Sequence, residues 1–175
     1  MYSTVNIITW SDNHMDIERI KIEYMPKITD DQLYDFYVRN DICEAGHGKE
    51  AAVKPLKYSP YMVGAFYEGK LVGIVRAVFD GLTAVIMEFC LELELQGDNL
   101  QYDNGSIIEK DQYDIAKKMG ILLIDELRKI GNTFVSAVIL QHSEQDVYTS
   151  IGFKFNEGHA EYIIDERPYV LSEIV

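Results

Sequence analysis

Apolar and polar residues alternate along several stretches of the chain, and the period of this alternation predicts the elements. Residues 17–25 alternate with a period of two, which is typical of a half-buried strand. Residues 61–67 and 71–79 are expected to form a hairpin, because Gly69 supplies a permissive turn between them. A third, unusually long strand is expected over 83–96. Three successive strands joined by tight turns predict an antiparallel meander.

Helical spacing of apolar residues begins shortly after the first strand. Thr29 and Gln32 resemble a capping box, and the apolar residues behind them recur at the helical period. A short helix is expected around 49–57. A longer helix is expected over 115–131, with Asp114 as the candidate N-cap residue.

The last part of the chain returns to strand patterns. Residues 133–140 form an unbroken apolar, β-branched run, which predicts a buried strand. A short helix capped by Ser143 is expected over 143–151, and two strands with a turn at Glu157–Gly158 are expected over 153–165. The sequence therefore predicts a mixed α/β fold: a mostly antiparallel central sheet with a βαβ crossover and flanking helices.

The length of the chain favours one domain. Its 175 residues are enough to bury a sizeable core, so residues 1–175 are interpreted as a single domain, with 1–16 as a candidate N-terminal extension. Residues 97–112 are polar, acidic and long for a connection. We expect this acidic insertion to be exposed and mobile.

The charge of the chain restricts its partners. A net charge of −13 repels phosphate backbones and anionic lipid, so neither nucleic acid nor a membrane is an expected partner. The same charge favours a cationic substrate, although an acidic surface also occurs without any partner. Cys43 and Cys90 have neither metal-ligand spacing nor the density of a disulfide scaffold, so no metal site is expected. No apolar run is long enough to cross a bilayer and no secretory signal is evident, which predicts a cytoplasmic protein.

Three motifs carry a resemblance to a known family. YTSIGF at 148–153, GILLIDEL at 120–127 and YEGKLVG at 67–73 occur within the predicted order of elements. This combination resembles the GCN5-related N-acetyltransferase (GNAT) superfamily over residues 18 to 165. The resemblance implies an N-acetyltransferase that uses acetyl-CoA as its cosubstrate.

The resemblance places the acetyl-CoA pyrophosphate at the start of the helix over 115–131. Lys117, Lys118, Met119 and Gly120 would contact it there, through backbone N–H groups and through positive charge. The family usually opens this helix with Arg/Gln-x-x-Gly-x-Gly/Ala. Here Ile115 and Lys118 replace the first and middle residues of that motif, so the glycine that favours close approach of the backbone to the phosphate is absent. Two adjacent lysines also commonly form a solvated face.

The pantetheine arm would lie between two diverging strands. In the family it bonds to free backbone groups of the long strand, which here are those around Leu91, Glu92, Leu93 and Leu95. Gln141 stands where the family often has an asparagine that holds the same arm. Glutamine keeps the amide group but lengthens the side chain, so the match is partial.

The predicted catalytic groups are a base on the long strand and a tyrosine. A period of two places Glu88, Cys90, Glu92 and Glu94 on one face of the strand. Glu92 is the first candidate for the general base and Glu88 the second, and the alternative is that Glu92 and Glu94 merely face water near the end of the strand. In the family the tyrosine at the position of Tyr148 protonates the departing thiolate. The alternative is that Tyr148 is a buried aromatic residue that packs the last helix on the sheet.

The leading interpretation is transfer of an acetyl group to a primary amine of a small, cationic molecule or a peptide. An alternative is a degenerate, non-catalytic member that binds an acyl-CoA, or nothing, and acts as a sensor or interaction module. A third is a dimer whose acidic insertion docks a basic partner protein. Dimers are frequent in the superfamily, so the resemblance makes a homodimer one expected assembly.

Overall fold

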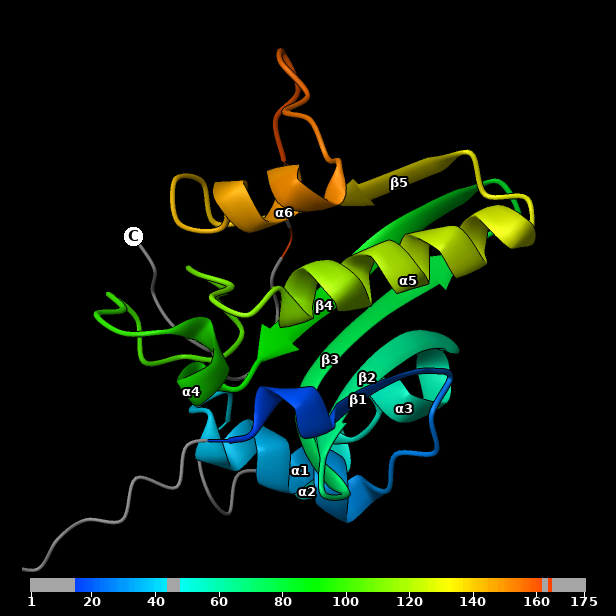
Figure 1. The fold of residues 1–175 in the computed structure, drawn as a ribbon. Helices are drawn as coiled ribbons and strands as arrows, with labels where there is room; N and C mark the ends of the chain where they lie inside the picture. The colour runs from blue at the N-terminus through cyan, green and yellow to red at the C-terminus, as the bar shows by residue number, and fades with distance from the viewer. Residues whose placement is uncertain (1–14, 44–47, 162–163, 165–175) are drawn as a thin grey trace, which may run out of the picture.

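The fold is that of a computed structural model, which describes residues 15–43, 48–161 and 164. Most of the predicted N-terminal extension lies outside the described residues, as do parts of the last predicted strand. The central sheet has five strands in the order β1-β2-β3-β4-β5 (Figure 1).

The first four strands pair with their neighbours in antiparallel fashion. They are β1 (Ile20–Tyr24), β2 (Tyr61–Tyr67), β3 (Lys70–Phe79) and β4 (Thr83–Leu91). The fifth strand, β5 (Phe134–Ala137), is parallel to β4. The meander and the parallel crossover were both predicted from the sequence, and both are confirmed.

Helices cover both faces of the sheet (Figure 1). They are the 3-10 helix η1 (Ile17–Arg19), α1 (Asp30–Arg39), α2 (Lys49–Ala52), α3 (Pro55–Tyr58), α4 (Leu93–Gln96), α5 (Ile115–Lys129) and α6 (Gln145–Ile151). One core cluster lies between α5, α6 and the sheet, and a second lies between α1 and the opposite face of β3 and β4. The second cluster contains Cys90, which is fully buried and carries a free thiol.

The helix that follows β1 begins as the sequence predicts. The Thr29 hydroxyl accepts a hydrogen bond from the Gln32 N–H, and the Gln32 side chain accepts one from the Thr29 N–H. This reciprocal pair satisfies two backbone donors that the first turn would otherwise leave open. Leu33 and Phe36 on the apolar face of α1 are fully buried. The predicted helix around 49–57 is instead two four-residue helices, α2 and α3.

The long strand predicted over 83–96 is wrong in its second part. β4 ends at Leu91, and residues 93–96 form the short helix α4. The Glu92 N–H still bonds to the Val72 carbonyl, but the Leu93 N–H bonds to the Asn40 side-chain oxygen, at 3.0 Å. The hydrogen bonds of the sheet therefore stop at Leu93, whose N–H bonds to the side chain of Asn40 at the end of α1 instead of to a strand.

Part of the acidic insertion is packed against the domain, so the expectation that it is exposed is wrong for residues 105, 107 and 108, while its mobility stays a prediction. Ile107 and Ile108 are buried, and Ile108 is part of the α5-side core. The Gly105 N–H bonds to the Asn40 carbonyl at 2.8 Å, and the Leu91 N–H bonds to the Gly105 carbonyl at 3.0 Å. An added Cβ at Gly105 would lie 2.8 Å from the Asn40 Cβ and 3.0 Å from the Leu91 oxygen, so only glycine allows this approach.

The chain after α5 is less regular than predicted. β5 has four residues instead of the eight expected over 133–140, and Phe134 is 53% exposed instead of buried. α6 begins at Gln145, and Ser143 does not cap it. The predicted turn at Glu157–Gly158 is present, but the described residues up to 161 form no strand there.

Candidate functional site

The candidate site lies where β4 and β5 separate. The two strands pair only from Thr83 with Phe134 to Ile86 with Ala137, and β4 then continues to Leu91 paired with β3 but not with β5 (Figure 1). The register between β3 and β4 shifts at the same place, since Arg76 faces Glu88 and Ala77 faces Ile86. This β-bulge leaves one extra residue in β4 and re-aims the side chains that follow it.

Tyr148 lies on α6 beside the separating strands. It is buried, and its ring packs edge-to-face on Phe89 of β4 and on Phe153, with ring centroids 5.9 and 5.4 Å apart. Burial raises the pKa of Tyr148, and the nearby Glu144 and Cys90 raise it further. Within the described part of the chain its hydroxyl makes no hydrogen bond. Tyr148 is thus a protonated phenol at neutral pH, and the packing of its ring on Phe89 and Phe153 holds the side chain in place.

Glu144 is a buried carboxylate one turn before Tyr148, and the sequence analysis did not single it out. Its two oxygens accept hydrogen bonds from the Leu140 N–H at 2.8 Å and the Ile108 N–H at 3.2 Å. Burial raises the pKa of Glu144, against the effect of these two bonds. The side chain therefore joins the insertion to the segment that leaves β5. An acidic residue four positions before Tyr148, just ahead of the helix that contains the tyrosine motif, was the only signal in the sequence.

Glu88 belongs to a polar cluster on the face of β4 that α1 covers. The Arg76 guanidinium forms an ion pair with its carboxylate and also donates to the Ser59 hydroxyl at 2.8 Å. The Cys90 thiol donates to the other carboxylate oxygen, at 3.3 Å. Burial raises the pKa of Tyr37 strongly, and the Glu88 charge and a hydrogen bond to it add to this. Glu88 is therefore anchored next to the bulge, among groups from α1, α3 and β3.

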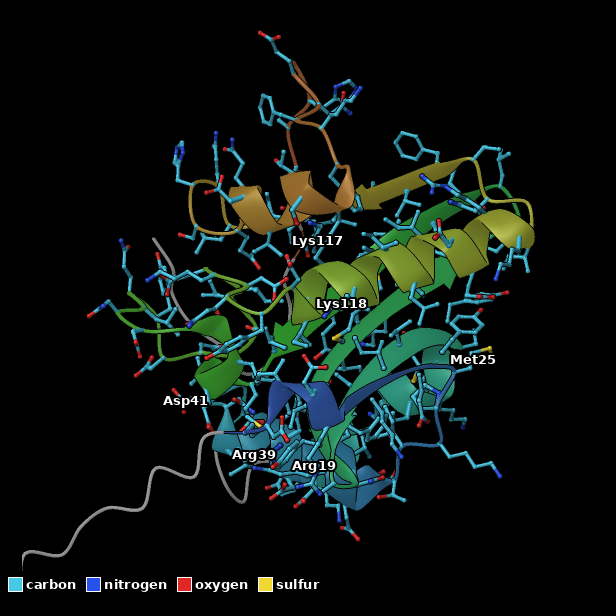
Figure 2. All side chains as sticks on the ribbon, in the orientation of Figure 1. Arg19, Met25, Arg39, Asp41, Lys117 and Lys118 are labelled. Atoms are coloured by element: carbon cyan, nitrogen blue, oxygen red, sulfur yellow. The ribbon has the colours of Figure 1, made fainter. Side chains whose placement is uncertain are left out.

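Glu92 lies one residue beyond β4 and is only 7% exposed. Arg39 donates to its two oxygens at 2.9 to 3.1 Å, and the Asn40 side-chain nitrogen donates at 3.1 Å. The Lys70 ammonium is 3.7 Å away. Figure 2 shows Arg39 near the C-terminal end of α1, on the side where α4 lies. This arrangement ties α1 to the end of β4. Glu94, the third glutamate of the predicted face, is on α4 and not on the strand.

The first turn of α5 is occupied by an acidic side chain of the insertion. The Asp111 carboxylate accepts hydrogen bonds from the Ala116 N–H at 3.0 Å and the Lys117 N–H at 2.8 Å. Burial raises the pKa of Asp111, while the amides of Lys117, Ala116 and Ile115 act in the opposite direction. Asp114, the predicted cap, has a left-handed backbone and makes no side-chain cap bond.

The four predicted phosphate-binding residues differ in their exposure to solvent. Lys117 and Lys118 lie at the N-terminal end of α5, and Lys118 is exposed (Figure 2). The Lys117 ammonium is 3.7 Å from Asp114. Met119 is buried in the core, and Gly120 is buried against α6, where an added Cβ would lie 2.6 Å from the Ile151 Cδ1. Met119 thus packs in the core, and the absence of a side chain at Gly120 lets α5 lie close to α6.

The backbone groups predicted to hold the pantetheine arm have partners within the chain. The N–H groups of Leu91, Leu93 and Leu95 bond to the Gly105 carbonyl, the Asn40 side chain and the Glu92 carbonyl. Leu93 and Leu95 also lie on α4 and are not at a strand edge, which corrects their predicted placement. Gln141 is exposed in the turn before α6.

Neither a metal-binding cluster nor a membrane-spanning helix occurs among the described residues. The described part of the chain brings together no group of three histidine, cysteine, aspartate or glutamate side chains that could hold a metal ion. Among the same residues, no helix combines the length and apolar character needed to cross a bilayer.

No family model and no curated relative matches the sequence, but solved structures do match the fold. A probable acetyltransferase of unknown function from methicillin-resistant Staphylococcus aureus matches with a TM-score of 0.60 and 17% identity, over 83% of this chain and 99% of that one. A GNAT family acetyltransferase from Streptococcus pneumoniae matches with a TM-score of 0.59 and 14% identity, over 85% and 99%. An aminoglycoside N-acetyltransferase bound to a CoA–monomethyl-acetylneamine bisubstrate analogue matches with a TM-score of 0.56 and 13% identity, over 86% and 99%. The chain has the GNAT fold.

The GNAT fold accounts for the elements that the site brings together. The separating strands, the helix after the long strand and the tyrosine helix all occur in the order that the sequence predicted. Identities of 12 to 17% establish the fold and leave the chemistry to the residues of this chain.

Proposed function

We propose that this protein is an N-acetyltransferase that uses acetyl-CoA and acts on a primary amine of a small, cationic molecule or peptide. The observation that carries the proposal is Tyr148, a protonated phenol whose ring is fixed beside the point where β4 and β5 separate. The aminoglycoside N-acetyltransferase and its bisubstrate analogue, bound on a fold of the same kind, support this class of reaction.

The proposed reaction forms a C–N bond and breaks the C–S bond of the thioester. The neutral amine attacks the carbonyl carbon, and the sulfur leaves as a thiolate. Tyr148 donates its proton to that thiolate, and an acidic side chain takes the proton that the amine nitrogen loses. The phenol is protonated at neutral pH, so Tyr148 has a proton to donate, and the burial that raises its pKa also makes it a weaker acid.

Glu88 and Glu92 are both candidate bases, and each carboxylate is ion-paired, Glu88 with Arg76 and Glu92 with Arg39. Glu88 lies beside the bulge, just beyond the point where β4 loses its pairing with β5, and Tyr37 and Cys90 hydrogen-bond to its carboxylate. Glu92, the first candidate from the sequence, is enclosed by Arg39, Asn40 and Lys70. Its role as a base stays a prediction.

The charge of the chain supports a cationic acceptor. With 29 acidic and 16 basic residues, the protein attracts cations over long distances and raises their rate of encounter. This effect concerns the rate and not the identity of the substrate, so the proposal goes no further than the charge class of the acceptor.

The test is acetyl transfer from acetyl-CoA to a panel of amines, with wild type compared with Tyr148→Phe. Loss of a general acid typically lowers the rate by about 100-fold or more, so we expect kcat to fall by that factor. Acetyl-CoA affinity and melting temperature should hardly change, because the ring remains and the hydroxyl has no partner among the described residues. Equal kcat in both proteins would contradict the role given to Tyr148.

A second candidate function is binding without catalysis. The observation that favours it is the occupied first turn of α5, where Asp111 takes the amides that a pyrophosphate would need. An acyl-CoA-binding sensor would bind the cofactor and show no transfer to any amine. The amine panel, run beside calorimetric titration of acetyl-CoA, separates the two functions.

A further inference from the structure

Backbone donors at two separate points of the candidate site are bonded to groups of the insertion. Asp111 takes the amides of Ala116 and Lys117 at the start of α5. The Gly105 carbonyl takes the Leu91 N–H at the end of β4. Asp111 and Gly105 both belong to the insertion at 97–112.

A third contact fixes the insertion from the opposite side. The Ile108 N–H donates to Glu144, whose other oxygen accepts from Leu140 after β5. Ile108 itself is buried in the α5-side core. The segment from Gly105 to Asp111 is thus bonded to β4, α5 and the start of α6. We call this segment, residues 105–111, the plug.

The donors that the plug takes are among those that the resemblance to the GNAT superfamily assigns to an acyl-CoA. Helix N-termini bind phosphate through unpaired N–H groups and a favourable dipole, and both features are directed here at a carboxylate. An anionic ligand would also have to approach an aspartate at the same place, which repels it. Cofactor and plug therefore compete for the same hydrogen-bond donors.

We propose that the plug is a built-in competitor of the acyl-CoA cosubstrate, and that Asp111 sets the affinity of this site for the CoA pyrophosphate. The inference rests on the proposed function for the identity of the ligand. Binding of acetyl-CoA moves Asp111 off the first turn of α5 and releases the Leu91 N–H from Gly105. The insertion thereby acts as an autoinhibitory contact that only a tightly bound cofactor displaces.

Asp111→Ala tests the proposal with two probes, acetyl-CoA and inorganic pyrophosphate, by calorimetric titration. Since a hydrogen bond to a charged group is worth more than a neutral one, we expect both probes to bind about tenfold more tightly to the variant than to wild type. The matched control is Asp103→Ala, because Asp103 is an exposed acid in the same insertion. This control removes an equal charge and should change either affinity by less than about twofold.

Asp111→Asn provides a second variant that keeps an oxygen acceptor for the amides and removes only the charge. It should fold even if loss of the cap in Asp111→Ala destabilises α5. We expect it to bind both probes more tightly than wild type and less tightly than Asp111→Ala. Unchanged pyrophosphate and acetyl-CoA affinities in both Asp111 variants, or equal gains in Asp103→Ala, would overturn the proposal.

Failure of the proposed function has a different signature. If the Asp111 variants gain pyrophosphate and acetyl-CoA affinity but no amine is acetylated, the plug is confirmed and the enzyme proposal fails. If wild type acetylates an amine and the Asp111 variants bind both probes as wild type does, the enzyme proposal stands and the plug fails.

Discussion

Two of the three glutamates on the predicted catalytic face, Glu88 and Glu92, each have both a catalytic and a structural interpretation. Alternation with a period of two correctly placed Glu88 and Cys90 together, on the face that α1 covers. It could not indicate that Glu92 would meet Arg39, because these residues are far apart in the sequence. A buried ion pair depends on the packing of α1 on the sheet, which no local pattern contains.

Replacement of Glu92 separates a structural role from a catalytic one. Glu92→Gln would leave Arg39 without its main partner in a nearly buried place, so we expect a loss of about 3 kcal/mol in the free energy of unfolding. The double variant Arg39→Met/Glu92→Leu should recover more than half of this loss, since a well-packed apolar pair can replace a buried ion pair. Urea denaturation measures both. A Glu92→Gln protein with unchanged stability and a collapsed kcat would instead identify Glu92 as the base.

At the scale of elements, the helices and strands with strong periodicity were predicted well and their ends were not. The capping box of α1 and the meander were readable because each depends on residues close in sequence. The end of β4 was missed because Leu93 alternates like a strand residue while Asn40, from another element, bonds to its N–H. The insertion was predicted to be exposed from its acidity, although the apolar pair Ile107 and Ile108 was a visible signal for packing.

The contact between α5 and α6 provides a test at this scale. Gly120→Ala raises helix propensity by about 1 kcal/mol, but it forces a methyl group to within 2.6 Å of Ile151. We expect the clash to win and the variant to lose about 1 to 2 kcal/mol of stability.

Ile151→Val is the matched control, because it removes the methyl group that clashes. Alone it should cost about 1 kcal/mol, and in the Gly120→Ala background it should stabilise the protein. Thermal and urea denaturation of the four proteins give the sign of the coupling. Additive losses in the double variant would show that Gly120 is not required for this helix contact.

For the whole molecule, the buried acids and the large net negative charge both make the folded state less stable as the pH rises. Burial raises the pKa of Glu144 above its ordinary 4.5 and that of Asp111 above its ordinary 3.8. A carboxyl group with a raised folded-state pKa favours the folded state fully below its unfolded pKa, and this contribution is lost as the pH rises through the folded-state pKa. Asp80 has the opposite effect, since hydrogen bonds from the Thr83 and Leu82 amides lower its pKa. Its contribution to stability is lost only as the pH falls below 3.8.

We therefore expect the free energy of unfolding to decline as the pH rises from about 4.5 towards 7. Glu144→Gln should make this decline shallower, because the group that loses its proton is gone. Urea denaturation at four or five pH values measures the slope, and Glu157→Gln, at an exposed position, is the matched control. Equal slopes in wild type and Glu144→Gln would contradict the assignment.

The short ladder between β4 and β5 has a consequence for the order of folding. The strands of the meander pair with their sequence neighbours, whereas Thr83 must find Phe134 across the insertion and the whole of α5. Because closing a long loop costs entropy before its contacts form, we expect the meander to form first and β5 to join late. Tyr148 follows β5 in the chain and packs on Phe89 of β4. A newly made molecule therefore acquires its candidate site in the last step of folding, after most of its sheet is already in place.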